Sequence, residues 1–292
     1  MSGVLLSIPS PPTGVYHVGP LTIHMYGLML LLAIAAAIWL TGRRWVRWGG
    51  DWDLVYRVAI WGVIFGIIGA RIYHLITSWN QDSAIQAHWY GPFAVWSGGL
   101  GIWGAIPFGA AAGAWVVRRS GNSVRLYMDA VAPGLLLAQG IGRWGNYWNQ
   151  ELYGGHTTLP WALEIHGKGA AHLYHPTFLY EFIWDLLAVG ALLWIDRRFT
   201  LRRPALFSLY VAFYTAFRTY EETLRIDPSN HFLGQRINFW VSLLVFVCSV
   251  AFFVWWQFLR TPSGEKPEVK KARPIPKGPT MAVPRGRVRQ RG

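Results

Sequence analysis

The sequence predicts an all-α integral membrane protein with about seven transmembrane helices and a small extracytoplasmic head. Hydrophobic residues make up 53% of the 292-residue chain, whereas charged residues make up only 14%. An average soluble domain has roughly 25% charged residues. Tryptophan occurs 18 times, and its ring favours the membrane–water interface. The apolar residues also come in long blocks, which indicates spanning helices.

Seven apolar segments approach the length of about 20 residues that a spanning helix needs. They cover 22–42, 55–77, 96–117, 126–145, 178–195, 204–220 and 236–259. We therefore expect an N-terminal extracytoplasmic segment over 1–21 and a seven-helix membrane domain over 22–259. The head is expected at about 146–177. The tail over 260–292 is rich in Pro, Lys and Arg and is expected to be disordered.

The basic residues predict the orientation of these segments. Most of the 27 lysines and arginines follow the first, third, fifth and seventh segments. Lys and Arg are enriched in cytoplasmic loops, so the N-terminus is expected outside and the C-terminus in the cytoplasm. The net charge of +13 is then explained by topology and by attraction to anionic membrane lipids. No nucleic-acid-binding motif is present, and nucleic acid is not an expected partner.

Cysteine and metal chemistry are not expected in this chain. The single cysteine, Cys248, lies within an apolar segment and has no partner for a disulfide. A small buried hydrophobe is its simplest interpretation. The histidines of the 146–177 loop have no accompanying carboxylate–histidine motif. No metal and no cofactor are therefore predicted.

Ionisable residues near the expected outer ends of the segments are the main functional candidates, because charge in a membrane is costly. Arg143 closes the fourth segment, and Glu181 lies one turn into the fifth. The sixth segment ends with four polar residues at steps of four, four and three, which places them on one helical face. These are Tyr214, Arg218, Glu222 and Arg225.

Two arginines on facing helices suit a phosphate group held at the membrane surface. Arginine makes planar, bidentate and permanently charged contacts to phosphate. Glu222 is expected to orient Arg218, and Glu151 is expected to orient Arg143. The alternative is a set of ion pairs that only lock helices together. It is less favoured, because buried ion pairs stabilise little and are costly in lipid.

Several motifs occur together in order. The first segment contains His24-Met-Tyr26, and the second contains Gly69-Ala-Arg71. The third begins with the sequence Trp96-Ser-Gly-Gly-Leu. The motif over Gly142–Gly154 holds Arg143, Asn146, Asn149, Glu151 and Gly154. It is followed by Pro160-Trp-Ala, by His175-Pro with Tyr180-Glu181, and by Tyr214 to Arg225. With these motifs, residues 20–258 resemble the prolipoprotein diacylglyceryl transferase family.

The resemblance implies a reaction and a location. Such an enzyme moves the diacylglyceryl group of phosphatidylglycerol to a cysteine thiol in the signal peptide of a lipoprotein precursor. A thioether forms and glycerol phosphate leaves. The expected location is a bacterial plasma (inner) membrane, and the expected partners are phosphatidylglycerol, the precursor's signal peptide and membrane lipids. Arg143 and Arg218 would stabilise the charge on the leaving phosphate.

The resemblance also assigns roles to individual positions. The catalytic candidates are Tyr26, Tyr214, Arg218 and Glu222. The candidates for binding phosphatidylglycerol are Arg143, Asn146, Glu151, Gly154, Arg218 and Arg225. The candidates for a supporting role are His24, Arg71, Trp103, His175, Tyr180 and Glu181.

Trp103 departs from the family pattern. Well-known members have a histidine at this position, and that histidine is a proposed base. An indole has no basic lone pair, so the acceptor of the thiol proton is left among Tyr26, His24, Tyr214 and Glu222. We expect Trp103 to pack and to position substrate, with an interfacial anchor as the alternative.

Two further function classes compete with the transferase. A transporter or flippase for an anionic lipid would use the same arginines to line a passage. It would need polar groups that continue toward the cytoplasmic side, where Asp129 and Asp185 are the exceptions in otherwise apolar segments. A membrane scaffold for a lipoprotein-processing complex would not need arginines and amides clustered at one depth.

Overall fold

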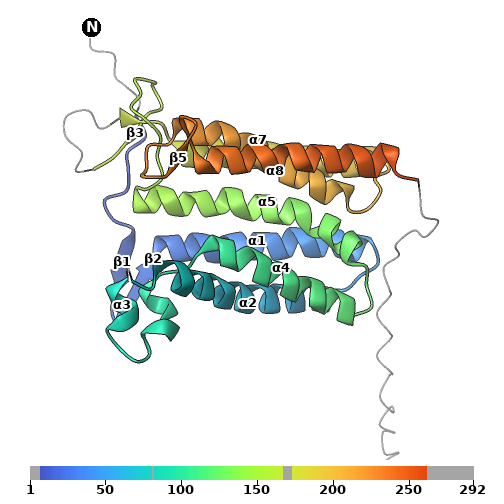
Figure 1. Ribbon diagram of the computed structural model, residues 1–292, viewed down its shortest axis with the longest axis horizontal. Coiled ribbons are helices and arrows are strands. Elements are labelled where there is room, and N and C mark those ends of the chain that lie inside the picture. Colours follow the sequence, from blue (N-terminus) through green and yellow to red (C-terminus); the bar gives the residue numbers. More distant parts are fainter. Residues whose placement is uncertain (1–6, 81, 167–172, 262–292) are drawn as a thin grey trace, which may run out of the picture.

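Long helices dominate the computed structural model, which describes residues 7–80, 82–166 and 173–261. Within these ranges, seven long helices correspond to the seven predicted segments. They are α1 (Met25–Arg47), α2 (Trp52–Ser78), α4 (Ile102–Arg119), α5 (Val124–Asn149), α6 (Thr177–Arg198), α7 (Ala205–Leu224) and α8 (Ile237–Val254), which continues as the π-helical η3 (Trp255–Leu259). The helices lie side by side (Figure 1).

Four of these helices are long and apolar enough to cross a membrane: α1, α2, α6 and the continuous Ile237–Leu259. The chain is therefore a mostly helical protein with four candidate spans. Some predicted boundaries were wrong. The third helix begins at Ile102 rather than 96, because the positive-φ glycines Gly98 and Gly99 interrupt the chain before it. The first begins at Met25, after a strand that occupies the start of the predicted segment.

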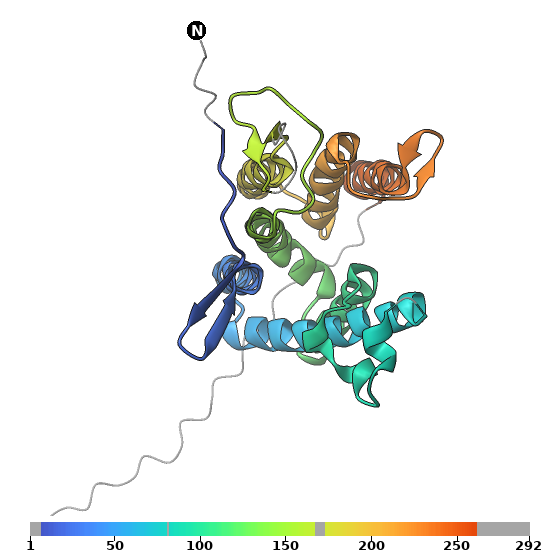
Figure 2. The same ribbon diagram turned by 90° about the vertical axis from the view of Figure 1, so that its left-hand side faces the viewer.

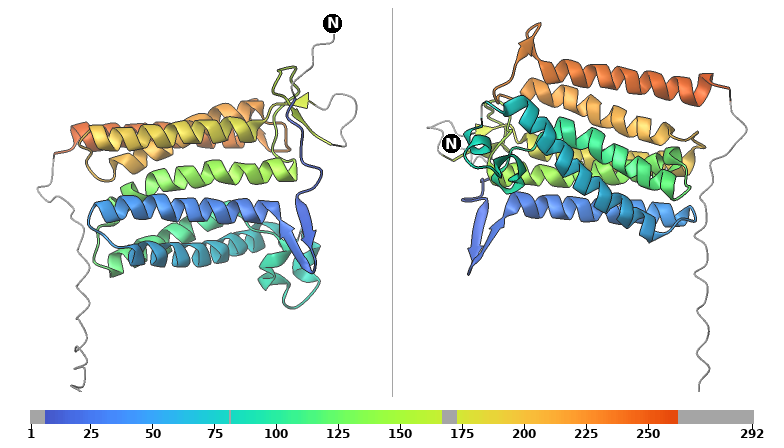
Figure 3. Two further views of the ribbon diagram at one scale, coloured as in Figure 1. Left: turned by 180° about the vertical axis from the view of Figure 1, so that it is seen from behind. Right: turned by 60° about the horizontal axis from the view of Figure 1, so that its bottom comes forward.

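Three small hairpins gather at one end of the helices, which we call the hairpin end (Figures 1 and 3). They are β1 (Val15–Val18) with β2 (Leu21–His24), β3 (Leu163–Glu164) with β4 (Leu173–Tyr174), and β5 (His231–Phe232) with β6 (Gln235–Arg236). The short helices α3 (Ser83–Gln86), η1 (Gly91–Phe93) and η2 (Val95–Ser97) lie at the same end. Within the described residues, the opposite end carries the short connections 48–51, 120–123 and 199–204 and the end of η3.

Helix α5 continues to Asn149 and α6 begins at Thr177, so the connection that was predicted to form a head covers 150–176. Gln150 caps the end of α5, and its φ of 52° turns the chain into the connection. Residues 167–172 of this connection, and 262–292 of the predicted disordered tail, lie outside the described residues. The expectation for the tail is therefore not tested.

Helix α5 is the centre of the bundle and positions the site. Viewed from the hairpin end, it lies between α1 and the α6–α7 pair (Figure 2), and it contacts all three. Its inward part packs with α6 and α7 around the fully buried Leu136, Leu192 and Leu206. Its outward part carries Arg143 to the hairpin end.

An ionic cluster joins four helices at the opposite end. Asp196 of α6 binds Arg44 of α1 across 3.1 Å and Arg203 across 2.9 Å. Arg203 also reaches Asp129 of α5 at 3.2 Å, and Asp129 accepts from the backbone N–H of Phe207 of α7. Because its members are paired in this way, Asp129 has a structural role between helices.

Candidate active site

Arg143 lies at the centre of a contact between three helices. Its Nη2 donates to Oε1 of Glu181 on α6 across 2.6 Å and lies 3.5 Å from the hydroxyl oxygen of Tyr214 on α7. Glu181 is 1% exposed. The expectation that Glu151 orients Arg143 was wrong in this structure. Glu151 is exposed, and its Oε1 accepts from Asn149 Nδ2 across 3.4 Å.

Arg218 of α7 lies between two carboxylates of its own helix. Its Nη1 donates to Glu221 and its Nη2 donates to Glu222. Steps of three and four residues bring these side chains together on one helical face, so the predicted pairing of Arg218 with Glu222 is confirmed. Both glutamates are 1% exposed. Glu221 is a member of the cluster that the sequence interpretation did not include.

A second arginine binds Glu222 from the next hairpin. Arg236, the last residue of β6, donates from Nε to Glu222 Oε2 across 2.6 Å and from Nη2 to Asp227 Oδ2 across 2.8 Å. Arg225 donates from Nε to the other oxygen of Asp227 across 2.7 Å. Burial acts to raise the pKa of Asp227, but the hydrogen bonds and charges of the two arginines outweigh it, so this pKa lies below its ordinary value. The roles of Asp227 and Arg236 depend on how the α7–α8 connection folds, and only their charge marks them in the sequence.

Gly154 joins the α5–α6 connection to the end of α7. Its N–H donates to the carbonyl of His175, and it forms a β-bridge with Arg225. A Cβ on Gly154 would lie 2.8 Å from the Cβ of His175 and 3.1 Å from the carbonyl oxygen of Leu224. The close approach of the backbones therefore requires glycine at this position.

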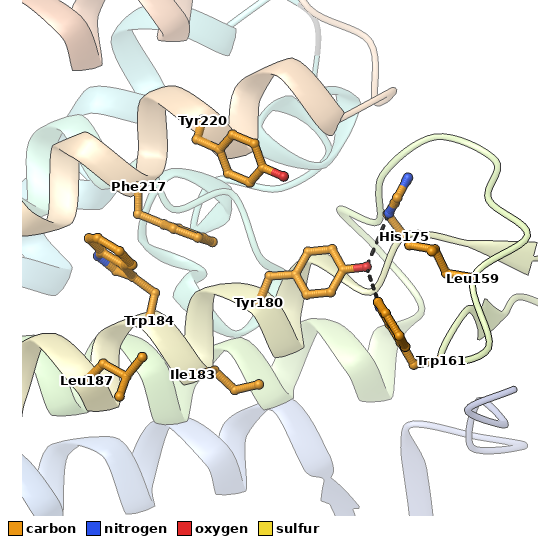
Figure 4. Close-up of a pocket in the computed structure, with 9 residues that line it drawn as sticks. All are labelled: Leu159, Trp161, His175, Tyr180, Ile183, Trp184, Leu187, Phe217 and Tyr220. Carbon is orange, nitrogen blue, oxygen red and sulfur yellow. Dashed lines mark hydrogen bonds between the residues drawn. The ribbon is translucent and has the colours of Figure 1, made fainter. Parts of the chain in front are cut away.

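His175 and Tyr180 form a separate polar chain near the start of α6. The hydroxyl of Tyr180 accepts from Trp161 Nε1 across 3.0 Å and lies 3.2 Å from His175 Nδ1 (Figure 4). These residues line a largely apolar cavity of about 400 Å³ between α6, α7 and the connection. Its lining also includes Leu159, Ile183, Trp184, Leu187, Phe217 and Tyr220.

Arg71 is a supporting residue of the hairpin end. Its guanidinium is buried and donates to the backbone carbonyls of Gly91, Pro92, Gly98 and Gly99 at 2.6 to 3.1 Å. It thereby holds the segment between α2 and α4 against α2. A guanidinium with this many carbonyl partners positions the chain and is not free for a phosphate.

The other predicted site residues lie at different depths. Tyr26 lies in the first turn of α1 and packs on α5, where a Cβ at Gly145 would lie 2.6 Å from its ring. Asn146 of α5 is buried, at 6% exposed. His24 is exposed at the end of β2, and Trp103 is 55% exposed in the first turn of α4. The structure thus brings Tyr214 against Arg143, and it leaves His24 and Trp103 on the surface.

The chain matches a known protein family over most of its length. The model of one family, described as prolipoprotein diacylglyceryl transferase, matches residues 13–255. The chain belongs to the prolipoprotein diacylglyceryl transferase family. The predicted resemblance is therefore confirmed, and so is the prediction that the chain is a transferase.

Similar members of the prolipoprotein diacylglyceryl transferase family come from several bacteria. Phosphatidylglycerol–prolipoprotein diacylglyceryl transferase 1 of Streptomyces coelicolor is 47% identical over 254 residues, which cover 86% of this chain and 74% of the relative. The enzyme of the same name from Streptomyces griseus is 46% identical, with 86% and 78% covered. That of Mycobacteroides abscessus is 44% identical over 270 residues, with 86% and 78% covered.

Proposed function

We propose that this chain transfers the diacylglyceryl group of phosphatidylglycerol to the cysteine thiol of a lipoprotein precursor's signal peptide. The relatives are named for phosphatidylglycerol and prolipoprotein, which supports both substrates. The observation that carries the proposal is the meeting of Arg143 and Arg218, from different helices, around Tyr214 and buried carboxylates at the hairpin end. A bacterial plasma membrane is the proposed location.

The proposed topology has seven spans, with the N-terminus and the hairpin end outside and the C-terminus in the cytoplasm. Helices α4, α5 and α7 lie alongside the four apolar helices and run between the same two ends (Figure 1), which supports their inclusion. The arginines in the last turns of α1 and α6 lie at the opposite, proposed cytoplasmic end, as the enrichment of basic residues on the cytoplasmic side requires. A reporter that functions only in the cytoplasm should be active when it is fused after Phe258. Activity at the same position of a reporter that functions only outside the membrane would contradict this topology.

In the proposed mechanism, the two arginines hold the phosphate of phosphatidylglycerol. Their side chains are 16% and 15% exposed, so neither arginine is fully buried. A sulfur–carbon bond forms at the glyceryl group as its carbon–oxygen bond to phosphate breaks. The leaving glycerol phosphate gains negative charge, which Arg143 and Arg218 stabilise with charge-assisted hydrogen bonds.

The thiol proton needs an acceptor near the arginines, because the thiolate is the nucleophile. Of the four predicted acceptors, Glu222 is poorly suited, since Arg218 and Arg236 engage both of its oxygens. Tyr214 is the best placed, because it lies against Arg143. The positive field of the arginines also favours the thiolate.

A transporter is the alternative that the structure disfavours. A passage for an anionic lipid would need polar groups that continue from the arginines toward the cytoplasm. Between α5, α6 and α7, that route meets Leu136, Leu192 and Leu206, which are each 0% exposed. The polar site is closed at its inner end, as suits a reaction performed on one face.

The test measures turnover with radiolabelled phosphatidylglycerol and a lipobox peptide. Arg143→Ala and Arg218→Ala should each lower turnover by about 10²–10³-fold, the effect of one lost oxyanion donor. Lysine at either position should restore only part of the lost turnover, because its ammonium group cannot make the bidentate contact of a guanidinium. Arg57→Ala is the control, since Arg57 is half exposed and pairs only with Asp53 within the described residues. Wild-type turnover in both folded alanine variants would refute the proposal.

A further inference from the structure

Asp185 is a buried carboxyl without a hydrogen-bond partner. It lies on α6, is 0% exposed, and neither Oδ1 nor Oδ2 is hydrogen-bonded within the described residues. Gly140 of α5 faces it: a Cβ there would lie 3.1 Å from the Cβ of Asp185 and 3.4 Å from Oδ2. An ionised carboxylate without a donor is costly to bury. The side chain must therefore either bind a proton or interact with a nearby cation.

The charged and titratable groups that face Asp185 come from all three helices around it. Glu181 lies one turn closer to the hairpin end on α6. Arg143 of α5, with Glu221 and Tyr210 of α7, also interacts electrostatically with Asp185. Arg143 is the one cation in this described group, and it is already paired with Glu181 at 2.6 Å. A second ionised carboxylate would compete for the same guanidinium.

Apolar side chains close the inner side of this group. Leu136, Leu192 and Leu206 form a fully buried apolar layer between the same three helices. Charges that water does not screen interact more strongly than charges at a surface. The ionisation of Asp185 therefore has a large effect on Arg143, and protons reach Asp185 from the arginine side.

We propose that Asp185 is a positioning residue that controls Arg143. With Asp185 protonated, the guanidinium keeps its net positive field and is directed to the substrate phosphate. With Asp185 ionised, the guanidinium is drawn inward and neutralised. Phosphate binding and proton binding to Asp185 therefore favour each other, since coupling between two sites is reciprocal. The inference rests on the proposed function, in which Arg143 holds the phosphate of phosphatidylglycerol.

The test is the pH dependence of KM for phosphatidylglycerol in mixed vesicles at a fixed concentration of lipobox peptide. The phosphodiester of phosphatidylglycerol is a monoanion at every pH used in the assay, so its own charge is constant. In the wild type, KM should rise with pH, by up to about tenfold per pH unit once Asp185 is ionised, as one linked proton requires. The kcat is measured separately, because it also depends on the ionisation of the peptide's cysteine thiol.

Asp185→Asn should keep KM low and independent of pH, because the amide is permanently neutral. If the asparagine variant does not fold, Asp185→Leu replaces it. Leucine is of similar size and has no charge, so the KM should again be independent of pH. Asp53→Asn is the matched control, because Asp53 is 74% exposed at the start of α2. It should follow the wild-type pH profile.

Two results would overturn the role of Asp185. A wild-type KM that does not change with pH contradicts it without any variant, and so does a pH-dependent KM that persists in Asp185→Asn. The Arg143→Ala variant separates this failure from that of the proposed function. If Arg143→Ala is impaired while the wild-type KM is flat, only the role of Asp185 is wrong. If Arg143→Ala is fully active, the phosphate contact itself is wrong.

Discussion

Arg236 Nε donates to Glu222 Oε2 across 2.6 Å and thereby connects the β5–β6 hairpin to α7. Glu222 simultaneously accepts from Arg218 through its other oxygen. One carboxylate thus holds a proposed substrate-binding arginine and a structural arginine together. Because Glu222 is buried, its loss leaves two arginines without this charge, and breaking a buried pair is strongly destabilising.

Glu222→Gln is expected to lower the free energy of unfolding by about 3–5 kcal/mol and to reduce turnover through Arg218. Thermal unfolding in detergent and turnover per folded molecule are the measurements. The double variant Glu222→Gln with Arg236→Gln should lose less stability than the two single variants added together, because the partners are coupled. Strict additivity would show that the pair does not act as a unit.

Gly154→Ala is expected to lower stability by about 1–3 kcal/mol, as overpacking does, and to reduce turnover. The added Cβ would lie 2.8 Å from His175 and 3.1 Å from the Leu224 carbonyl, so the α5–α6 connection must move away from α7. The neighbouring Gly155→Ala is the matched control. Its nearest contact would be 3.8 Å, to Ile226, so near-wild-type behaviour is expected. Equal effects of the two variants would contradict the close-approach argument.

Trp103→Phe is expected to retain most of the activity, and Trp103→His is expected to add no required base. The indole is 55% exposed in the first turn of α4, and an indole has no basic lone pair. Turnover of both variants is measured across roughly pH 6 to 9, a range that includes the ordinary thiol pKa. Loss of turnover in a folded Trp103→Phe enzyme would assign a direct role to the indole N–H.

Asp227 is expected to make stability depend on pH in the acidic range. Its pKa lies below the ordinary value of a carboxyl because Arg225 and Arg236 outweigh the effect of burial. Its contribution is therefore present above the unfolded pKa of about 3.9 and is lost as the pH falls through the lower folded value. Asp227→Asn should lower Tm at neutral pH and flatten the decrease in Tm below about pH 4. A wild-type acid profile in this variant would contradict the assignment.

Much of the fold follows from hydropathy, because a helix in lipid must satisfy its own backbone and present apolar side chains over a fixed length. The seven long helices were predicted on this basis. The third helix was misplaced at its start, since residues 96–101 form the end of η2 and a glycine turn held by Arg71. Hydropathy does not distinguish such a turn from a helix when its side chains are apolar.

By itself, the sequence determined the family through its ordered motifs and the helices through their hydropathy. It also determined the local pair of Arg218 and Glu222, because helical periodicity places the two residues one turn apart. Only the tertiary structure decided that Arg143 pairs with Glu181 rather than with Glu151, and that Arg236 completes the site from the start of α8. It also decided that Asp185 lies buried against Gly140. Contacts between helices depend on how each helix is rotated and displaced in the bundle, and spacing along the chain does not contain those quantities.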